Sequence, residues 1–252
     1  MTRFKAAGIH LLASVLVLAA LGIAMVFAWY GVELFGLMGA GRLLTLLVLI
    51  SLSAGPLLTL LVYRPGKKHL ALDLSVVVLL QLAFLVWGVF FMWQSRPVFL
   101  VGVLDRFELV FASELDAADL AQASPTYRKL TAFEPRVVGA RGGSTPAERL
   151  AFAVSGLAGK DVQLFPSQYV PYEEVAAELL SRAQPLETFL DGRDAGVQER
   201  VARWLSAAER TTDSVVVVPI TSRRGAAAML LDAATGIPVG PIGIDPWARD
   251  TK

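Results

Sequence analysis

Residues 43–94 read LLTLLVLISLSAGPLLTLLVYRPGKKHLALDLSVVVLLQLAFLVWGVFFMWQ, and their hydropathy defines the N-terminal part of the chain. It contains two long apolar runs, 43–63 and 74–94, separated by the basic sequence RPGKKH at residues 64–69. Each run reaches the roughly 20 residues that a helix needs to cross a hydrocarbon core of about 30 Å. The stretch therefore predicts two transmembrane helices joined by a short basic loop.

A third apolar run precedes this pair, because residues 6–32 carry no formal charge. We expect three spans, at about residues 8–30, 43–63 and 73–94. They should be helical because no water reaches the backbone inside a bilayer. A cleaved signal peptide is the alternative for the first run, with Arg3 and Lys5 as its basic start. The apolar region of a signal peptide is only about 7–15 residues long, so a retained anchor is favoured.

The distribution of basic residues predicts how the chain is oriented. Arg3 and Lys5 precede the first run and the cluster 64–69 precedes the third, whereas the connection between the first two runs offers only Arg42 against Glu33. The positive-inside rule places the N-terminus and the second loop in the cytoplasm. Because three spans put the termini on opposite sides, residues 96–252 should form an exported domain after a transmembrane bundle at 1–95.

The composition of the exported part excludes several classes of function. Only six of the 23 basic residues and two of the 22 acidic residues precede Ser95, so the exported part has a slight acidic excess. A nucleic-acid-binding module should carry a basic patch, and we therefore expect no nucleic-acid partner. The chain has no cysteine, which excludes disulfides and a thiol nucleophile. A segment of this length is expected to enclose one hydrophobic core.

The pattern after residue 95 alternates between strand-like and helix-like segments. Strands are predicted at 97–103, 107–111, 214–220, 226–231 and 237–244 from short apolar runs bounded by turn residues. Helices are predicted at about 115–121, 145–157, 172–182 and 197–210 from apolar residues three and four positions apart. The predicted fold class is therefore a membrane protein with three N-terminal transmembrane helices and an α+β domain. We expect an antiparallel sheet and about four helices in that domain.

The best-marked helix start lies at Thr145, where a hydroxyl, a proline and Glu148 together form a capping box. Its buried face is expected to include Leu150, Val154 and Leu157. The glycines at 139, 142 and 143 match neither the phosphate-loop spacing nor the dinucleotide fingerprint, so we interpret them as a turn.

Five residues are candidates for binding a partner: Gly55, Pro56, Gln81, Arg223 and Arg224. Gly55 and Pro56 interrupt the second span, where proline removes a helical hydrogen bond and favours a kink. Helix packing is the more common reason for such a pair. Gln81 lies inside the third span and is able to hydrogen-bond across the bundle. The two arginines occupy a hairpin turn, where they either face solvent or bind an acidic partner.

Catalytic sites can be tested by elimination. Both histidines, His10 and His69, lie in the membrane part, so the exported domain cannot form a Ser-His-Asp triad or a histidine-ligated metal site. A Ser-Lys pair would require Lys129 or Lys160, and neither has a nucleophile motif nearby. We therefore expect no enzyme activity, no metal and no cofactor.

Five stretches together resemble the type IV pilin accessory proteins. They are Arg3–Leu12 (RFKAAGIHLL), Gly55–Thr59 (GPLLT), Arg96–Val98 (RPV), Asp105–Glu108 (DRFE) and Ile244–Trp247 (IDPW). The resemblance is strongest over about the first 110 residues and returns near the C-terminus. It implies a bacterial inner-membrane protein whose C-terminal domain lies in the periplasm.

The resemblance further implies a pilin-specific chaperone or stabiliser that assists pilus assembly, with the type IV major pilin and the lipid bilayer as its partners. It supplies no catalytic residues, and the sequence leaves a homo-oligomer open. The main alternative is an envelope sensor whose periplasmic domain binds a ligand and signals through the membrane helices. A glycan-modifying enzyme acting on pilin is a third reading, against which stands the lack of suitable acid, base and metal-binding groups.

Overall fold

The computed structural model describes residues 2–35, 39–143 and 145–248. The chain forms two compact units, one of Met1–Ala28 with Gly39–Ser95 and the other of Trp29–Met38 with Arg96–Lys252. We call them the helical unit and the mixed unit. The segment Trp29–Phe35, which follows the first long helix, thus belongs with the C-terminal residues.

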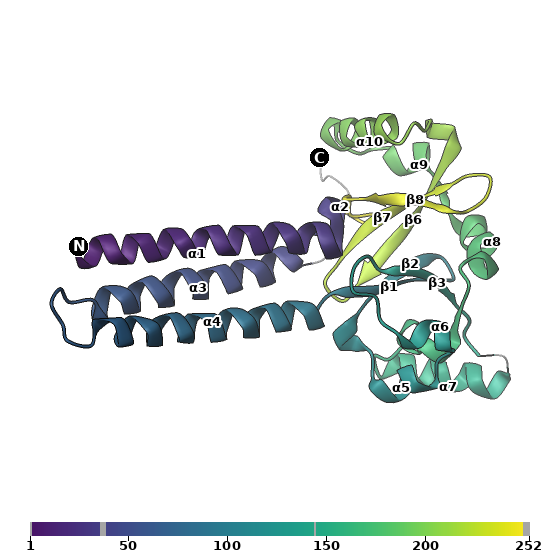
Figure 1. Cartoon of the computed structure of the whole chain (residues 1–252). Coiled ribbons are helices and arrows are strands. Elements are labelled where there is room, and N and C mark those ends of the chain that lie inside the picture. The colour runs from purple at the N-terminus through teal and green to yellow at the C-terminus, as the bar shows by residue number, and fades with distance from the viewer. Residues whose placement is uncertain (1, 36–38, 144, 249–252) are drawn as a thin grey trace. The chain divides into compact units, whose positions relative to one another are not determined.

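Three long helices make up the helical unit (Figure 1): α1 Arg3–Met25, α3 Ala40–Val62 and α4 Leu70–Gln94. All three are long and apolar enough to cross a membrane, which confirms the predicted number of spans. Helix α1 packs on α3, and α3 packs on α4. Pro56 lies inside α3, which continues as a helix to Val62.

The mixed unit is built on one sheet of eight strands in the order β4-β3-β1-β2-β6-β7-β8, with β5 also paired to β6. Its strands are β1 Pro97–Val103, β2 Arg106–Phe111, β3 Arg136–Ala140, β4 Tyr169–Val170, β5 Gln184–Pro185, β6 Val215–Ser222, β7 Gly225–Asp232 and β8 Pro238–Ile242. Strands β6, β7 and β8 pair antiparallel in sequence, as expected for the end of the domain, and β1 also pairs antiparallel with β2.

The sheet as a whole is mixed, which corrects the expectation of an antiparallel sheet. Strand β1 pairs in parallel with β3, and β2 pairs in parallel with β6 through Phe107 opposite Ile220 and Glu108 opposite Thr221. Whether two distant strands pair in parallel depends on the path of the segments that connect them. The local apolar pattern does not predict that path. The fold class itself, membrane helices followed by a domain of helices and strands, is confirmed.

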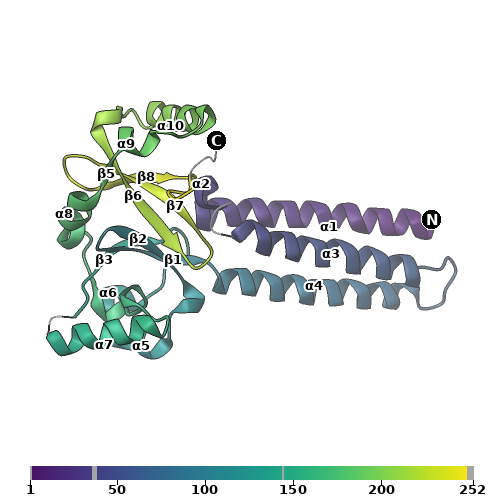
Figure 2. The same ribbon diagram turned by 180° about the vertical axis from the view of Figure 1, so that it is seen from behind.

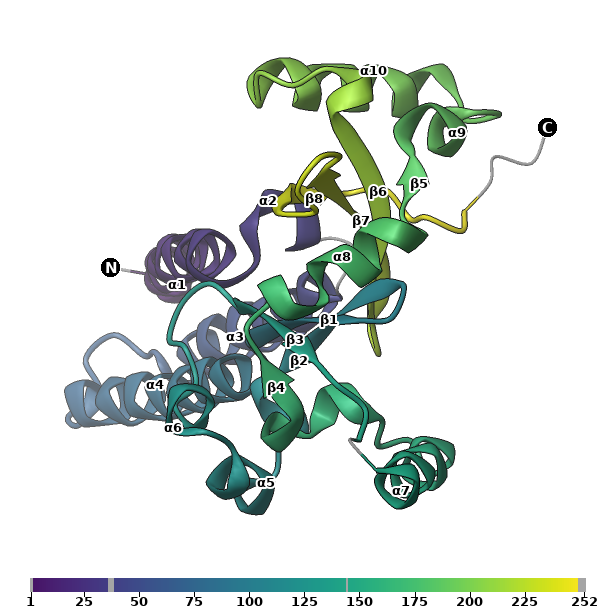
Figure 3. The same cartoon turned by 90° about the vertical axis from the view of Figure 1, so that its right-hand side faces the viewer.

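In the part of the mixed unit that the structure describes, six α-helices follow β2: α5 Ala117–Gln122, α6 Pro125–Arg128, α7 Pro146–Leu157, α8 Glu173–Arg182, α9 Leu186–Leu190 and α10 Ala195–Ala207. Figures 1 and 2 show α5, α6 and α7 beside one end of the sheet and α9 and α10 beside the other. In Figure 3, α8 lies across the sheet between these two groups.

The hydrophobic core of the mixed unit includes two clusters of buried side chains. One cluster combines β1, β2 and β3 with Ala123, Tyr127, Val162, Leu164 and Tyr169. Another combines β6, β7 and β8 with Leu186, Phe189, Val201 and Leu205 of α9 and α10. The predicted amphipathic stripe of α10 is confirmed, because Trp204 packs against this second cluster.

Helix α7 differs from the expectation. The capping box of Thr145 and Glu148 is present. However, Leu150, Val154 and Leu157 are 66%, 58% and 90% exposed, so the face predicted to be buried is open. The helix is held instead by its other side, where the ring of Phe152 meets that of Phe165 at 5.1 Å. An amphipathic pattern predicts which side is apolar but does not ensure that a neighbour covers it.

Gly139 also differs from the expectation, because it was interpreted as part of a turn but lies within β3. A Cβ at this position would lie 2.6 Å from Val175 Cγ2 of α8. The glycine therefore allows α8 to approach the sheet closely.

The connecting segment Trp29–Phe35, which includes the short helix α2 Gly31–Phe35, is bound to the mixed unit at two places. The Trp29 indole donates to the carbonyl of Ala132 at 3.0 Å. The Glu33 carboxylate accepts from the backbone N–H of Gly243 at 2.9 Å, just after β8. The connection between α1 and α3 is thereby part of the same compact unit as the sheet.

Glu108 on β2 provides a test of the electrostatics of this sheet. Burial raises the pKa of its carboxyl, an effect that a hydrogen bond from Thr221 and the charge of Arg106 only partly offset. A carboxyl whose pKa is higher in the folded state destabilises the fold increasingly as pH rises above the unfolded value of about 4.5. We expect Glu108→Gln to raise the thermal midpoint of the full-length protein more at pH 7.5 than at pH 4.5.

Comparison of the variant with the wild type isolates this one group, because other carboxyls contribute with the opposite sign. Asp232, for example, has a lowered pKa owing to hydrogen bonds from Thr235. Asp105→Asn, at an exposed residue, is the matched control. A midpoint difference for Glu108→Gln that shrinks with rising pH would contradict this account.

Candidate functional site in the helical unit

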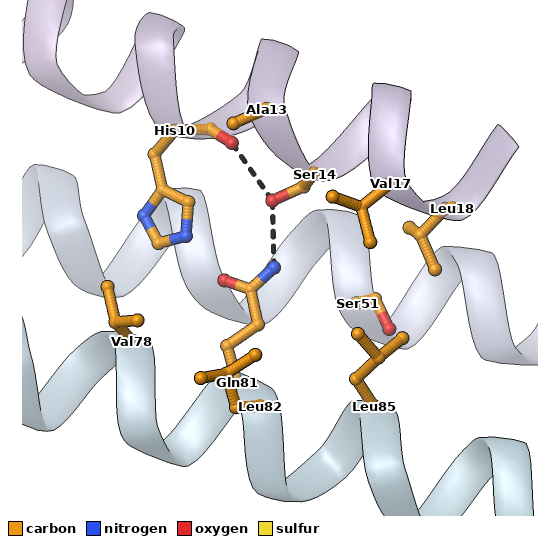
Figure 4. A pocket seen from close by; sticks show the side chains of 10 residues that line it. All are labelled: His10, Ala13, Ser14, Val17, Leu18, Ser51, Val78, Gln81, Leu82 and Leu85. Atoms are coloured by element: carbon orange, nitrogen blue, oxygen red, sulfur yellow. Dashed lines mark hydrogen bonds between the residues drawn. The ribbon is translucent and has the colours of Figure 1, made fainter. Parts of the chain in front are cut away.

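The three long helices line a groove of about 210 Å³ with a polar wall (Figure 4). Helix α1 contributes one side, α4 the other, and Ser51 of α3 lies between them. The lining residues are His10, Ala13, Ser14, Val17, Leu18, Ser51, Val78, Gln81, Leu82 and Leu85. Polar side chains inside membrane spans are rare and are commonly functional, so this groove is the candidate site.

A short chain of hydrogen bonds crosses the groove from α4 to α1. The Gln81 amide donates from Nε2 to Ser14 Oγ at 2.8 Å, and the Ser14 hydroxyl donates to the carbonyl of His10 at 2.9 Å. Figure 4 shows both bonds as dashed lines. The predicted hydrogen bond of Gln81 across the bundle is thus present. Such interhelical bonds contribute about 0.6 to 2 kcal/mol in a membrane.

A second polar contact joins α1 to α3. Nδ1 of His10 lies 2.6 Å from Oγ1 of Thr59, a residue that is only 3% exposed. Asp73, in the first turn of α4, also has a partner within the chain, because it forms an ion pair with Lys67.

Two polar atoms of the groove-lining residues have no hydrogen-bond partner, namely Oε1 of Gln81 and Oγ of Ser51. Ser51 is 4% exposed. A buried polar atom without a partner is costly where no water is present. Both atoms are enclosed by the bundle, and Gln81 Oε1 lies against Gly55 of α3.

The structure places Gly55 and Pro56 inside the bundle, where both are buried. A Cβ on Gly55 would lie 1.8 Å from Gln81 Oε1, so the glycine provides the space that the Gln81 amide fills. Gly55 and Gln81 are thereby brought together. This is the helix-packing interpretation of the Gly-Pro pair, while a role in binding a partner remains a prediction.

A second hollow, of about 240 Å³, lies between α3 and α4 and is almost wholly apolar. It is lined by Leu46, Leu47, Ile50, Ser51, Phe84, Trp87, Gly88, Phe91 and Met92. A Cβ on Gly88 would lie 2.2 Å from Leu47 Cδ1, so this glycine lets the two helices pack closely. Its walls could bind an apolar group but offer few hydrogen-bonding atoms to select one ligand over another.

The predicted arginine pair lies at the turn between β6 and β7, far in sequence from the groove. Arg223 donates from Nη2 to the carbonyl of Gly159 at 2.8 Å, and its Nε lies 3.5 Å from Glu114 Oε1. The guanidinium of Arg224 stacks 3.9 Å from the centroid of the Phe111 ring. Both side chains therefore have contacts within the mixed unit, and binding of an acidic partner stays a prediction.

Lys160, considered above as a catalytic base, is tied into an ion pair. Its Nζ lies 2.5 Å from Asp119 and 2.9 Å from Asp116. These hydrogen bonds raise the pKa of the lysine, which favours the protonated form over the free amine that a general base requires. Among the described residues, no group of three or more His, Asp or Glu side chains is arranged to hold a metal ion.

Sequence reasoning identified Gln81 but did not identify Ser14, Ser51 and Thr59 as members of the site. The available signal was their position as hydroxyl residues within apolar runs. That signal is weak, because a serine or threonine in a membrane helix often bonds to a carbonyl of its own helix. Thr45, Ser53 and Ser75 do so in this chain.

Three curated proteins of Dichelobacter nodosus are similar to this chain. The fimbrial assembly protein of serogroup E1 is 28% identical over 222 residues, which cover 87% of this chain and 86% of the relative. The serogroup I protein has the same identity and coverage. The fimbrial assembly protein of serogroups C1 and C2 is 32% identical over 121 residues, which cover 47% of this chain and 92% of the relative.

No protein-family model and no solved structure matches the chain. The alignment of 222 residues is longer than either the N-terminal 95 residues or the C-terminal 157, so it includes parts of both. The alignment with the relative at 32% identity covers 92% of that relative's length. On this similarity, and in agreement with the resemblance to the type IV pilin accessory proteins, the chain belongs to the family of fimbrial assembly proteins.

Proposed function

We propose that this protein is a non-enzymatic accessory factor of pilus assembly that binds a type IV pilin in the membrane and stabilises it. The observation that carries the proposal is the similarity to proteins named for fimbrial assembly over most of both chains. A pilin before assembly has one apolar helix and a folded head. A partner with both membrane helices and a domain outside the membrane is suited to contact both parts.

Two linked contacts would bind a pilin more tightly than either alone, because the first contact raises the effective concentration for the second. The helical unit provides a groove with exposed apolar rims for the membrane contact. The mixed unit provides the open apolar face of α7 and the arginine turn at Arg223 and Arg224 for contact with a head. By holding the pilin's helix and its head at the same time, the protein would act as a pilin chaperone.

We further propose that the protein lies in the bacterial inner membrane with its N-terminus in the cytoplasm and the mixed unit in the periplasm. The positive-inside pattern supports this orientation. Independent support comes from the connecting segment, since Trp29 and Glu33 bond to Ala132 and Gly243 of the mixed unit. A connection folded into the same unit as the sheet must lie on the same side of the membrane as the sheet.

Deletion of the gene in its own host is the direct test. We expect the steady-state amount of the pilin to fall and surface pili to be lost, because an unprotected pilin is open to proteolysis. Immunoblots and electron microscopy measure these effects, and complementation with the full chain should reverse them. Unchanged pilin level and piliation in the deletion strain would contradict the proposed function.

The non-enzymatic role makes a separate prediction. The intact mass of the pilin that remains in the deletion strain should equal that of pilin from the complemented strain, because the protein is proposed to bind pilin without modifying it. Mass spectrometry of purified pilin measures this. A mass difference that depends on the protein would support a modifying enzyme instead.

A further inference from the structure

The loop between α6 and β3 bonds to residues at the ends of two spans. Trp29 is the last residue of the first span, and its indole donates to the carbonyl of Ala132. Arg96 lies two residues after the third span, and its Nε donates to the carbonyl of Thr131 at 3.0 Å. Two consecutive residues of this loop are thus held where the first and third spans end.

The next residue of the loop, Phe133, is 67% exposed, although phenylalanine is usually buried in a soluble domain. Its Cα is only about 3.8 Å from that of Ala132, whose carbonyl bonds to the end of the first span. The interfacial region on each side of a bilayer adds about 5–8 Å to the hydrocarbon core. The ring of Phe133 therefore lies within reach of the interface of the membrane that the spans cross.

A second exposed aromatic residue, Trp247, is also tied to the end of the first span. Glu33, which closely follows that span, accepts from the backbone N–H of Gly243. Trp247 is 56% exposed and follows Gly243 by four residues, which extend over at most about 14 Å. Arg193 donates to the carbonyls of the residues on both sides of Trp247, so the backbone here is held in place.

The spans themselves end in aromatic residues on this side. The first span ends in VFAWY at residues 26–30, and the third ends in FFMWQ at residues 90–94. Aromatic side chains collect at membrane interfaces, where an apolar ring contacts the acyl chains and the polar edge of a tryptophan or tyrosine reaches the headgroups. Phe133 and Trp247 therefore place aromatic rings of the mixed unit near a level that the spans already line with such rings.

We infer that Phe133 and Trp247 form a membrane-contact patch, by which the mixed unit binds the interfacial region of the bilayer. The exposed charges of Lys129 and Glu134 beside Phe133 are of opposite sign, so the contact depends on the rings and does not require anionic lipid. The inference rests on the proposed membrane placement and goes beyond it, because it gives the mixed unit a direct contact with lipid. Such a contact limits how far the mixed unit can move from the membrane surface.

Spin labels on the full chain in phosphatidylcholine vesicles test the inference. Because the chain has no native cysteine, each introduced cysteine is the sole labelling site. Oxygen concentrates in lipid and nickel-EDDA stays in water. We expect the oxygen-to-nickel accessibility ratio to be several-fold higher at Phe133 and Trp247 than at Leu104 and Leu157, which are exposed apolar residues elsewhere in the mixed unit. Equal ratios at all four positions would overturn the inference.

A label at Leu79, which is exposed within α4, separates failure of the patch from failure of the membrane placement. A lipid-like ratio at Leu79 together with water-like ratios at Phe133 and Trp247 would overturn the patch and leave the placement standing. A water-like ratio at Leu79 would reject the placement and the patch together.

A reporter at Ala132 tests the native ring of Phe133, since a label that replaces this residue could itself enter the bilayer. Ala132 is exposed, so Ala132→Cys carries the label next to the intact ring. Adding Phe133→Ser should lower the oxygen-to-nickel ratio of this reporter several-fold, whereas adding Leu104→Ser, the matched control, should leave it unchanged. An unchanged ratio in the Phe133→Ser protein would overturn the assigned role of the ring.

Discussion

Replacing Gly55 with leucine is expected to disrupt the packing of α3 against α4. A Cβ at this position would lie 1.8 Å from Oε1 and 2.6 Å from Cδ of Gln81, so the amide and its bond to Ser14 would have to move. Overpacking of a closely packed core typically costs about 1–3 kcal/mol. The thermal midpoint of the purified full-length protein in detergent should therefore fall, together with its amount in membranes.

A compensating pair makes this prediction specific. Gly55→Ala alone should lower the midpoint, and adding Gln81→Ala should restore much of the loss because the shorter side chain vacates the space. Gly8→Leu is the control for adding a large side chain to a membrane helix, since nothing lies within 4 Å of a Cβ there. A Gly55→Leu protein that melts like the wild type would show that α3 and α4 do not pack as described.

Removal of the Arg193 side chain is expected to release the C-terminal segment from the mixed unit. Its guanidinium donates to the carbonyls of Phe189, Asp245, Pro246 and Ala248 at 2.9 to 3.1 Å, and it stacks 4.1 Å from the Phe189 ring centroid. Hydrogen bonds to a charged group contribute about 1.5–3 kcal/mol each when protected from water. Because this site is partly open, we expect Arg193→Ala to cost about 2–4 kcal/mol in total.

The Arg193→Ala variant should show a lower thermal midpoint and faster proteolysis near residues 245–248. Arg193→Lys should recover little, because a lysine retains the charge but cannot present donors in the same planar fork. Arg182→Ala is the control, since that arginine forms an exposed pair with Glu178 on one helix and its loss should change stability by less than about 0.5 kcal/mol. A fully protected C-terminus in Arg193→Ala would refute this account.

The contacts of Arg193 also show the structural role of one of the stretches that carry the family resemblance. Residues 244–247 read IDPW, and three of the four carbonyls that Arg193 holds belong to residues 245–248. Ile244 is buried in the core cluster with Phe189. The C-terminal stretch is therefore part of the folded domain and not an appended tail.

Hydropathy and local spacing predicted the parts of the structure that depend on neighbouring residues. The lengths of the apolar runs predicted the three long helices, because crossing a bilayer requires only enough consecutive apolar residues. The capping box at Thr145 and the terminal hairpins were likewise recognised, since each depends on residues a few positions apart. Gln81 was recognised because an amide within an apolar run needs a partner.

Features that depend on residues far apart in the sequence are known only from the fold. Parallel pairing of β1 with β3 and the exposure of the apolar face of α7 follow from which segments meet, and so does the seat of Gln81 against Gly55 and Ser14. Thr45 bonds to its own helix while Thr59 bonds across to His10, although both read alike in the sequence. The long apolar helices and the local elements were predictable because their free energies depend on nearby residues, whereas long-range packing selects which side chains come together.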